Sequence, residues 1–172
     1  MADIRPFRGL RYDTAHVALA DVVCPPYDVI APAAAGALRR LSPYNAVHVE
    51  LPVSPTSDPA ACYAAAAGLL DAWRAAGVLR ADDEPSLYLV SQRFAGAGGS
   101  EVTRRGFVCR LRLEDFSRRV VLPHEKTHAG PKRDRLELLR ATHAQLSQIF
   151  MLYADPADEV GRALAAAGAI TS

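Results

Sequence analysis

Hydrophobic and polar positions repeat with two different periods along this chain, and the two periods predict its helices and strands. The clearest helical stripe, with spacings of three and four residues, consists of Tyr63, Ala66, Leu70 and Trp73. It predicts a long helix that Asp58 caps and that ends near Ala76, immediately before Gly77. Further helices are predicted over residues 32–41, from residue 132 onward and over residues 157–167.

Alternation with a period of two predicts the strands. The strongest signal is a hairpin, in which residues 87–94 and 103–113 flank the glycine-rich turn 95–100. Other predicted strands cover residues 3–13, 16–24, 45–51, 120–122 and 147–153. Within 45–51, the alternation places His48 and Glu50 on the solvated face. The expected fold class is mixed α/β (α+β), a single domain with a sheet of about five or six strands, including one antiparallel hairpin, packed with helices.

Composition narrows the classes of function. The 172 residues suffice for one domain with its own hydrophobic core. The 20 basic and 19 acidic side chains leave no broad positive surface, so we expect no nucleic-acid partner. The longest apolar run, residues 60–70, is shorter than the roughly 20 residues that cross a membrane, so we expect no membrane span. Three widely spaced cysteines predict reduced thiols and a cytoplasmic location.

Side chains capable of chemistry follow the predicted strand 120–122. They are His124, Glu125, Thr127 and His128. Their order matches the pattern H-E-x-x-H, in which two histidines bind zinc and the glutamate activates water. That motif requires a continuous helix, and here Pro123 precedes it while a turn is expected at Gly130-Pro131. Zinc binding is therefore the least favoured interpretation of this segment.

The helix after this turn is predicted to carry three cations in its first turn, namely Lys132, Arg133 and Arg135. Positive charge at a helix N-terminus is unfavourable by about 0.3 to 1 kcal/mol per side chain unless an anion lies among the cations. Backbone N–H groups and these side chains would together bind a phosphate or a carboxylate. The alternative is an ordinary exposed first turn, in which Asp134 compensates the cations and Arg133 pairs with Glu137.

The same segment supports a catalytic interpretation. Glu125 is the expected general base for a hydroxyl group, and His124 is an alternative base or a substrate ligand. Mg²⁺ would bridge phosphate oxygens with help from Asp28 or Asp134. A buried ion pair, for example between Glu125 and Arg135, would give the same residue pattern without catalysis.

Several motifs in the chain are similar to those of a known family. They are IRPFRGLRYD, CPPYDVI, Pro43 to Asn45, Leu51-Pro52, PSLY, Arg105-Gly106, HEKT, DRLELL and IFMLY. Together they resemble the family called domain of unknown function 1015. The resemblance implies that His124, Glu125 and Thr127 act together with Asp134-Arg135, and that His128 is not required.

The resemblance also extends the expected site and suggests a wider relationship. The expected substrate-binding or phosphate-binding residues from these motifs are Arg5, Tyr27, Asp28, Asn45 and Thr127. Family members typically continue into a Gly-His-His-Arg motif similar to that of the ParB and sulfiredoxin superfamily, which includes nucleotide-using proteins such as free-serine kinases. This chain contains no such motif, so we expect it to correspond to the N-terminal half of the family pattern.

Three functions are consistent with the sequence. The leading hypothesis is a nucleotide-dependent phosphotransferase, or its substrate-binding half, which acts on a small hydroxylated metabolite with Mg²⁺ and ATP or ADP. The alternative is a non-catalytic ligand-binding or protein-interaction module whose exposed half-sheet forms a homodimer or meets a second family half. A zinc hydrolase that uses His124, Glu125 and His128 comes third.

Overall fold

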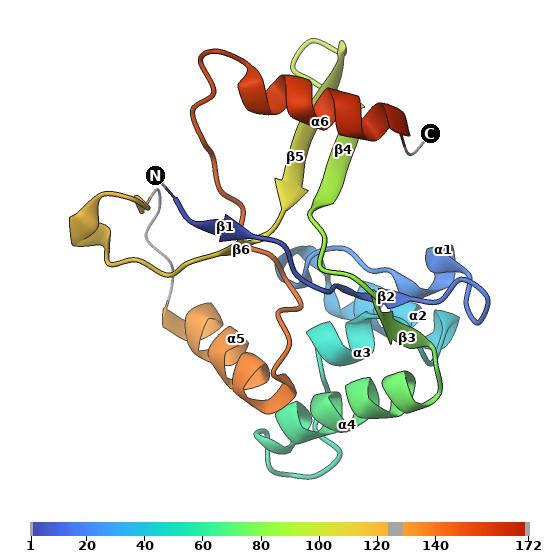
Figure 1. The fold of residues 1–172 in the computed structure, drawn as a ribbon. Helices are drawn as coiled ribbons and strands as arrows, with labels where there is room; N and C mark the ends of the chain where they lie inside the picture. The colour runs from blue at the N-terminus through green and yellow to red at the C-terminus, as the bar shows by residue number, and fades with distance from the viewer. Residues whose placement is uncertain (1, 124–128, 171–172) are drawn as a thin grey trace. The chain divides into compact units, whose positions relative to one another are not determined.

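A computed structural model describes residues 2–123 and 129–170 of the chain. The chain divides into two compact units (Figure 1). Unit 1 comprises Met1–Gly9, Asp83–Leu122 and Gln148–Ser172, and unit 2 comprises Leu10–Asp82 and Pro123–Ser147. Each unit is therefore assembled from segments that are far apart in the sequence.

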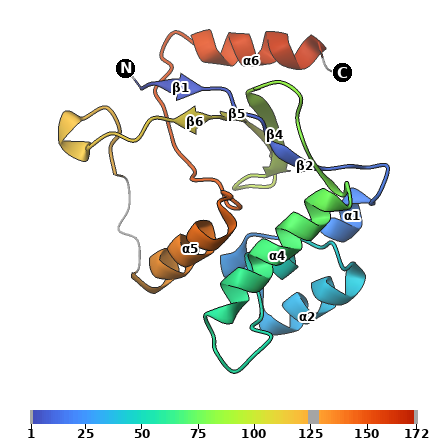
Figure 2. The same ribbon diagram turned by 60° about the horizontal axis from the view of Figure 1, so that its bottom comes forward.

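Unit 2 contains the first five α-helices. Its elements are β2 (Leu10–Tyr12), α1 (Leu19–Val22), the 3-10 turn η1 (Tyr27–Val29), α2 (Pro32–Leu41), α3 (Val47–Glu50), α4 (Ala61–Ala75), β3 (Leu79–Ala81) and α5 (Ala129–Thr142). Strands β2 and β3 pair in an antiparallel manner, with Leu10 opposite Ala81. Helix α5 packs against α4 (Figure 1 and Figure 2).

The hydrophobic core of unit 2 forms around α4. Its buried members are Val49, Ala66, Leu70, Trp73, Val78, Leu79 and Leu138. The stripe predicted on α4 supplies three of these residues, and Tyr63 packs against them, so the helical period identified the core face correctly. The helix ends where Gly77 adopts a φ of +74°, a conformation that glycine enters without strain.

Unit 1 contains most of the strands and the last helix. Its elements are β1 (Ile4–Arg5), β4 (Tyr88–Ala95), β5 (Glu101–Val108), β6 (Arg110–Leu111), the 3-10 turn η2 (Phe116–Arg118) and α6 (Glu159–Ile170). Helix α6 lies against the β4–β5 hairpin (Figure 1), and Leu164 lines a groove there together with Leu89 and Phe107. Among the described residues, every buried hydrophobic side chain belongs to unit 2, so unit 1 has no comparable core.

The mixed α/β class and the antiparallel hairpin are confirmed. The six strands pair two by two, as β1 with β6, β2 with β3 and β4 with β5. The predicted helices 32–41 and 157–167 correspond to α2 and α6. In the part of the chain that the structure describes, no helix is both long enough and apolar enough to cross a bilayer.

Four predicted strands are wrong. Residues 16–24 contain α1, residues 45–51 contain α3, and residues 120–122 and 147–153 have no strand. The Asn45 side chain explains the second case, because its Oδ1 accepts a hydrogen bond from the backbone N–H of Val47 at 3.0 Å and so begins a helical turn. Glu50, expected on a solvated face, is consequently buried.

Helix α5 begins earlier than predicted. It starts at Ala129, so Pro131 lies within its first turn instead of preceding the helix. Proline is tolerated at this place because the first four N–H groups of a helix have no partner within it. Lys132 therefore lies at the end of the first turn, and Arg133 and Arg135 lie in the second.

Candidate functional site

Arg135 joins α5 to the end of α3 within unit 2. Its Nη1 donates to Glu50 Oε2 at 3.0 Å, and its Nη2 donates to the carbonyl oxygen of Glu50 at 2.9 Å. Its Nε also donates to Oδ2 of the neighbouring Asp134 at 2.9 Å. The side chain is only 21% exposed. Because a guanidinium has five N–H groups in a fixed plane, these contacts use most of its binding capacity.

Tyr27 covers the face of the same guanidinium. The Arg135 Cζ lies 4.1 Å from the centre of the Tyr27 ring, which is a cation–π contact. The segment that precedes Tyr27 is held by Asn45, whose side-chain Nδ2 donates to the carbonyl oxygens of Asp21 at 2.8 Å and Val23 at 3.1 Å. Asn45 is completely buried and all its contacts are internal, so it positions the segment that leads to Tyr27.

Two hydroxyl groups complete the network. Tyr63 donates to Asp134 Oδ1 at 3.0 Å, and Ser147 donates to Glu50 Oε1 at 3.0 Å. Burial, followed by the hydrogen bond to Asp134, raises the pKa of Tyr63. Each carboxylate in the network thus accepts hydrogen bonds from two side chains, which compensates the buried Glu50 for the water it has lost.

The thiol of Cys24 lies in the same electrostatic environment. Its pKa is raised mainly by burial, and the negative charge of Glu50 adds to the effect. A raised pKa keeps the group in the thiol form, which is a poor nucleophile. The raised pKa therefore favours the neutral thiol at Cys24.

The cations nearest the start of α5 differ sharply in their partners. Lys132 and Arg133 are exposed, and neither forms a hydrogen bond or an ion pair with any residue that the structure describes. The expected Arg133 pairing with Glu137 is absent from the described contacts, because Glu137 binds Arg140 at 2.8 Å. Asp134, the other expected compensating group, is occupied by Arg135 and Tyr63.

The remaining predicted residues of unit 2 are placed as follows. Asp28 lies in η1, directly after Tyr27. His124, Glu125, Thr127 and His128 lie outside the described residues. Among residues 2–123 and 129–170, no three carboxylate, thiol or imidazole groups come together as a metal site.

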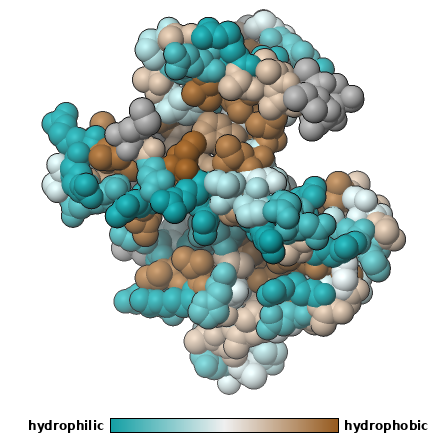
Figure 3. All heavy atoms as spheres, in the orientation of Figure 1, coloured by the Kyte–Doolittle hydropathy of each residue, from teal (hydrophilic) through white to brown (hydrophobic). Residues whose placement is uncertain are grey.

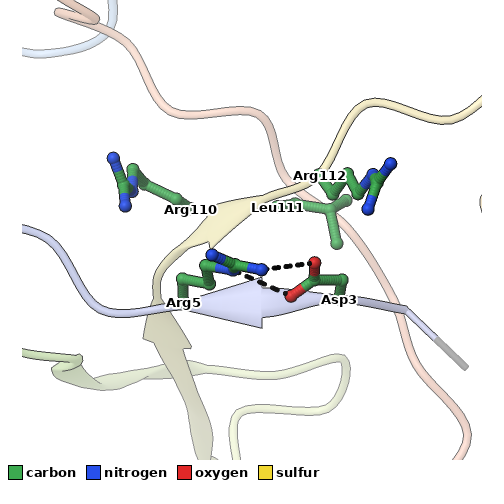
Figure 4. Close-up of a pocket in the computed structure, with 5 residues that line it drawn as sticks. All are labelled: Asp3, Arg5, Arg110, Leu111 and Arg112. Carbon is green, nitrogen blue, oxygen red and sulfur yellow. Dashed lines mark hydrogen bonds and ion pairs between the residues drawn. The ribbon is translucent and has the colours of Figure 1, made fainter.

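Arg5 belongs to unit 1 and lies in a different environment. It lines a cavity of about 370 Å³ whose other lining residues are Asp3, Arg110, Leu111 and Arg112 (Figure 4). Its Nε and Nη2 donate to the two carboxylate oxygens of Asp3, each at 3.2 Å. These bonds are the main cause of a lowered pKa at Asp3.

Sequence reasoning identified part of each site. It predicted Tyr27, Asp134 and Arg135, which the structure brings together, but missed Glu50, Tyr63 and Ser147. It also missed the two arginines that share the cavity with Arg5. The alternation of Arg110 and Arg112 along the predicted strand 103–113 was visible in the sequence, but the pairing of this segment with β1 was not.

Comparisons with known proteins identify the family. No curated protein and no solved structure matches the chain. Residues 4–171 match the model of the family described as "Protein of unknown function (DUF1015)". The match includes the residues around Arg135 and four of the residues that line the cavity, namely Arg5, Arg110, Leu111 and Arg112. The chain therefore belongs to the DUF1015 family.

Proposed function

We propose that this protein binds a phosphorylated small molecule beside the start of α5 and acts as a nucleotide-dependent phosphotransferase, or as its substrate-binding half. The observation that carries this proposal is the contrast among the three cations. Arg135 is fixed by Glu50 and Asp134, whereas the exposed Lys132 and Arg133 have no carboxylate partner among the described residues. Two cations that have no partner in the described part of the chain, near the positive end of a helix, favour an anion.

The hydrogen-bond network around Arg135 supports roles for Asp134 and Arg135 that differ from the roles predicted from the sequence. Arg135 and Asp134 act as positioning residues that fix α5 against Glu50, because their polar atoms are used inside the protein. Lys132 and Arg133 are the proposed phosphate ligands. A rigid anchor one or two residues away limits the positions that their side chains can reach, which favours binding by lowering the entropy that is lost.

The catalytic roles rest on the residues immediately before α5. We propose Glu125 as the general base for a substrate hydroxyl, His124 as a second base or a substrate ligand, and Thr127 as a phosphate-binding residue. Asp28 fits a Mg²⁺ ligand better than Asp134, because Asp134 accepts hydrogen bonds on both oxygens and Asp28 on neither in the described contacts. When bound with ATP or ADP, the metal would neutralise phosphate charge.

Two relationships suggested by the sequence, to a wider superfamily and to one half of the family pattern, are part of the same proposal. Similarity to the ParB and sulfiredoxin superfamily would favour a nucleotide as the phosphate donor, since that superfamily includes free-serine kinases. Correspondence to the N-terminal half of the family pattern would favour the substrate-binding role, with phosphoryl transfer completed by a second half. Both extensions are consistent with a cytoplasmic enzyme.

A second candidate is the ligand-binding or protein-interaction module. It is favoured by the apolar surface of unit 1, where Phe94, Phe150 and Leu152 are exposed. Hydrophobic side chains gather directly beneath α6 (Figure 3), over a groove that Ile4 and Leu87 help to line. Large exposed apolar surfaces commonly bind partners. Light scattering that shows a homodimer would support this candidate, and a monomer at high concentration would count against self-association.

The decisive experiment for the leading proposal is thermal unfolding with and without Mg²⁺ and ATP or ADP. A ligand at about 100 times its dissociation constant stabilises the native state by about 2.7 kcal/mol, which in a domain of this size raises the midpoint by about 5 to 10 °C. We expect the shift in the natural chain and in Arg140→Ala, an exposed variant at the other end of α5. It should disappear in Lys132→Ala/Arg133→Ala; equal shifts in all three proteins would refute the proposal.

A further inference from the structure

The β1–β6 ladder of unit 1 gathers arginines on one face. Arg5 stands directly opposite Arg110, and Ile4 stands opposite Leu111. The backbone N–H of Arg112 donates to the carbonyl oxygen of Asp3 at 2.9 Å, which continues the pairing by one more residue. Because side chains alternate between the two faces of a strand, Arg110 and Arg112 share a face with Arg5.

The charges on this face are not balanced. Three guanidinium groups and a single carboxylate line the cavity (Figure 4). That carboxylate, Asp3, is engaged by Arg5, and the Arg112 Nε lies 3.6 Å from Glu114, which also binds Arg118 at 2.6 Å. Arg110 has no hydrogen-bond or ion-pair partner among the described residues.

Arg5 and Arg110 project from directly opposed positions of the ladder. The guanidinium group of Arg5 turns toward Asp3, whereas that of Arg110 extends away from it (Figure 4). A small anion bound here would receive charge-assisted hydrogen bonds from these planar donors. A bound anion would therefore supply a negatively charged acceptor that the described side chains do not provide.

We propose that this cavity is a binding site for a small phosphate-bearing anion. A phosphate group carries a charge of about −1.5 to −2 near neutral pH, and the three arginines of the lining outnumber its single carboxylate. The volume of about 370 Å³ lies at the lower end of the range for small-molecule sites, roughly 300 to 1,000 Å³. Leu111 is the single apolar lining residue, so the cavity suits a polar anion and offers no stacking surface for a nucleobase.

This site is independent of the one proposed beside α5. It uses residues of unit 1 alone, whereas Lys132 and Arg133 belong to unit 2. The two proposals can therefore fail separately. The side chains of Arg5 and Arg112 are both well exposed, so the binding should be salt-sensitive.

The test is a titration of the 172-residue chain with inorganic phosphate, followed by amide chemical shifts in two-dimensional NMR. We expect saturable shifts at residues 3–5 and 110–112, and a dissociation constant raised at least about fivefold in Arg110→Ala, which loses one charge-assisted donor. Asp3→Asn should bind phosphate more tightly, because the substitution releases Arg5 and removes a negative charge. Arg93→Ala, an exposed arginine of the hairpin opposite Thr103, is the matched control and should bind as the natural chain does.

Each contrary outcome has a distinct meaning. Equal phosphate affinity in Arg110→Ala and the natural chain, or shifts that never saturate, would overturn the proposal and leave the arginines as solvated surface groups. Succinate binding as tight as phosphate binding would overturn the assignment to phosphate and indicate a dicarboxylate. Affinity lost in Arg133→Ala but kept in Arg110→Ala would place phosphate at α5 and overturn the unit 1 site.

Discussion

Arg5 and Arg110 stand directly opposite each other across the β1–β6 ladder, and of the two only Arg5 has a carboxylate partner among the described residues. A two-residue strand pair contributes little stability of its own, since isolated two-stranded sheets are marginal in water. Placing two like charges on such a pair is difficult to explain as a stabilising device. The positive charge on the ladder fits a role in binding an anion better than a role in stabilising the fold.

Reversing one of these charges should stabilise the free protein. In Arg110→Glu an opposite-charge pair with Arg5 replaces two like charges and is worth about 0.2 to 1 kcal/mol, which should raise the unfolding midpoint by at most about 4 °C. Phosphate should no longer protect the variant. Calorimetry at low salt would measure both effects, with Arg93→Glu as the control for a general change of charge. A lower midpoint in Arg110→Glu than in Arg93→Glu would show that Arg110 supports the fold.

The Arg135 network should be important for stability. Arg135→Ala leaves the buried Glu50 carboxylate without its cation, and we expect a loss of about 3 kcal/mol in urea unfolding. Combining Arg135→Met with Glu50→Gln should recover part of that loss, because no uncompensated charge then remains. Arg140→Ala, whose ion pair is exposed, should change stability by less than about 0.5 kcal/mol. A similar small loss in Arg135→Ala would contradict the positioning role.

The buried amide of Asn45 offers a simpler test. Asn45→Ala removes the donor to two backbone carbonyl oxygens, and leaving buried acceptors unsatisfied should cost about 2 kcal/mol in urea unfolding. Gln145→Ala removes an amide donor to the carbonyl oxygen of Ser147 on an exposed part of the same unit. That control should stay within about 0.5 kcal/mol of the natural chain. Equal effects of the two substitutions would mean that the Asn45 bonds are dispensable.

Tyr12 should be the last tyrosine to ionise in the folded protein. Burial raises its pKa, the neighbouring Cys24 adds to the rise, and its hydroxyl donates to the carbonyl oxygen of Tyr44 at 2.8 Å. The folded pKa lies above the unfolded value of about 10. Its contribution to stability is therefore complete below that pH and is lost as the pH rises through the folded value.

An alkaline absorbance titration of tyrosinate can detect this behaviour. We expect Tyr12→Phe to remove the latest phase of ionisation, which in the natural chain should coincide with unfolding. Tyr153→Phe, which removes the hydroxyl of a half-exposed tyrosine, should leave that phase in place. Retention of the latest phase in Tyr12→Phe would show that another tyrosine is the best protected.

Long periodic elements of this fold could be predicted from the sequence, and short ones could not. Helix α4 carries a stripe that only one helical face can explain, and the hairpin repeats its alternation on both strands. Helices α1 and α3 have four residues each, too few to show a period of 3.6. Their conformation depends on hydrogen bonds of the Asn45 side chain with the neighbouring backbone. The alternation of Val47 and Val49 in the sequence does not reveal those bonds.

The same limit applied to the sites. Tyr27, Asp134 and Arg135 could be identified because the family motifs contain them. Glu50 and Ser147 meet only through the fold, at a separation of 97 positions in the sequence. The alternation over residues 45–51 predicted a strand with Glu50 facing water. The segment forms a helical turn instead, and a helical turn places Glu50 on a different face than a strand does.

The pairing of β1 with β6 also constrains the order of events during synthesis. Arg5 leaves the ribosome roughly a hundred residues before Arg110, which at about 5 to 20 residues per second is an interval of about 5 to 20 s. The whole first segment of unit 2 emerges within that interval. Nascent chains halted shortly before Arg110 should therefore contain β1 without its partner, and inorganic phosphate should have no arginine-lined cavity to occupy until Arg112 has left the ribosome.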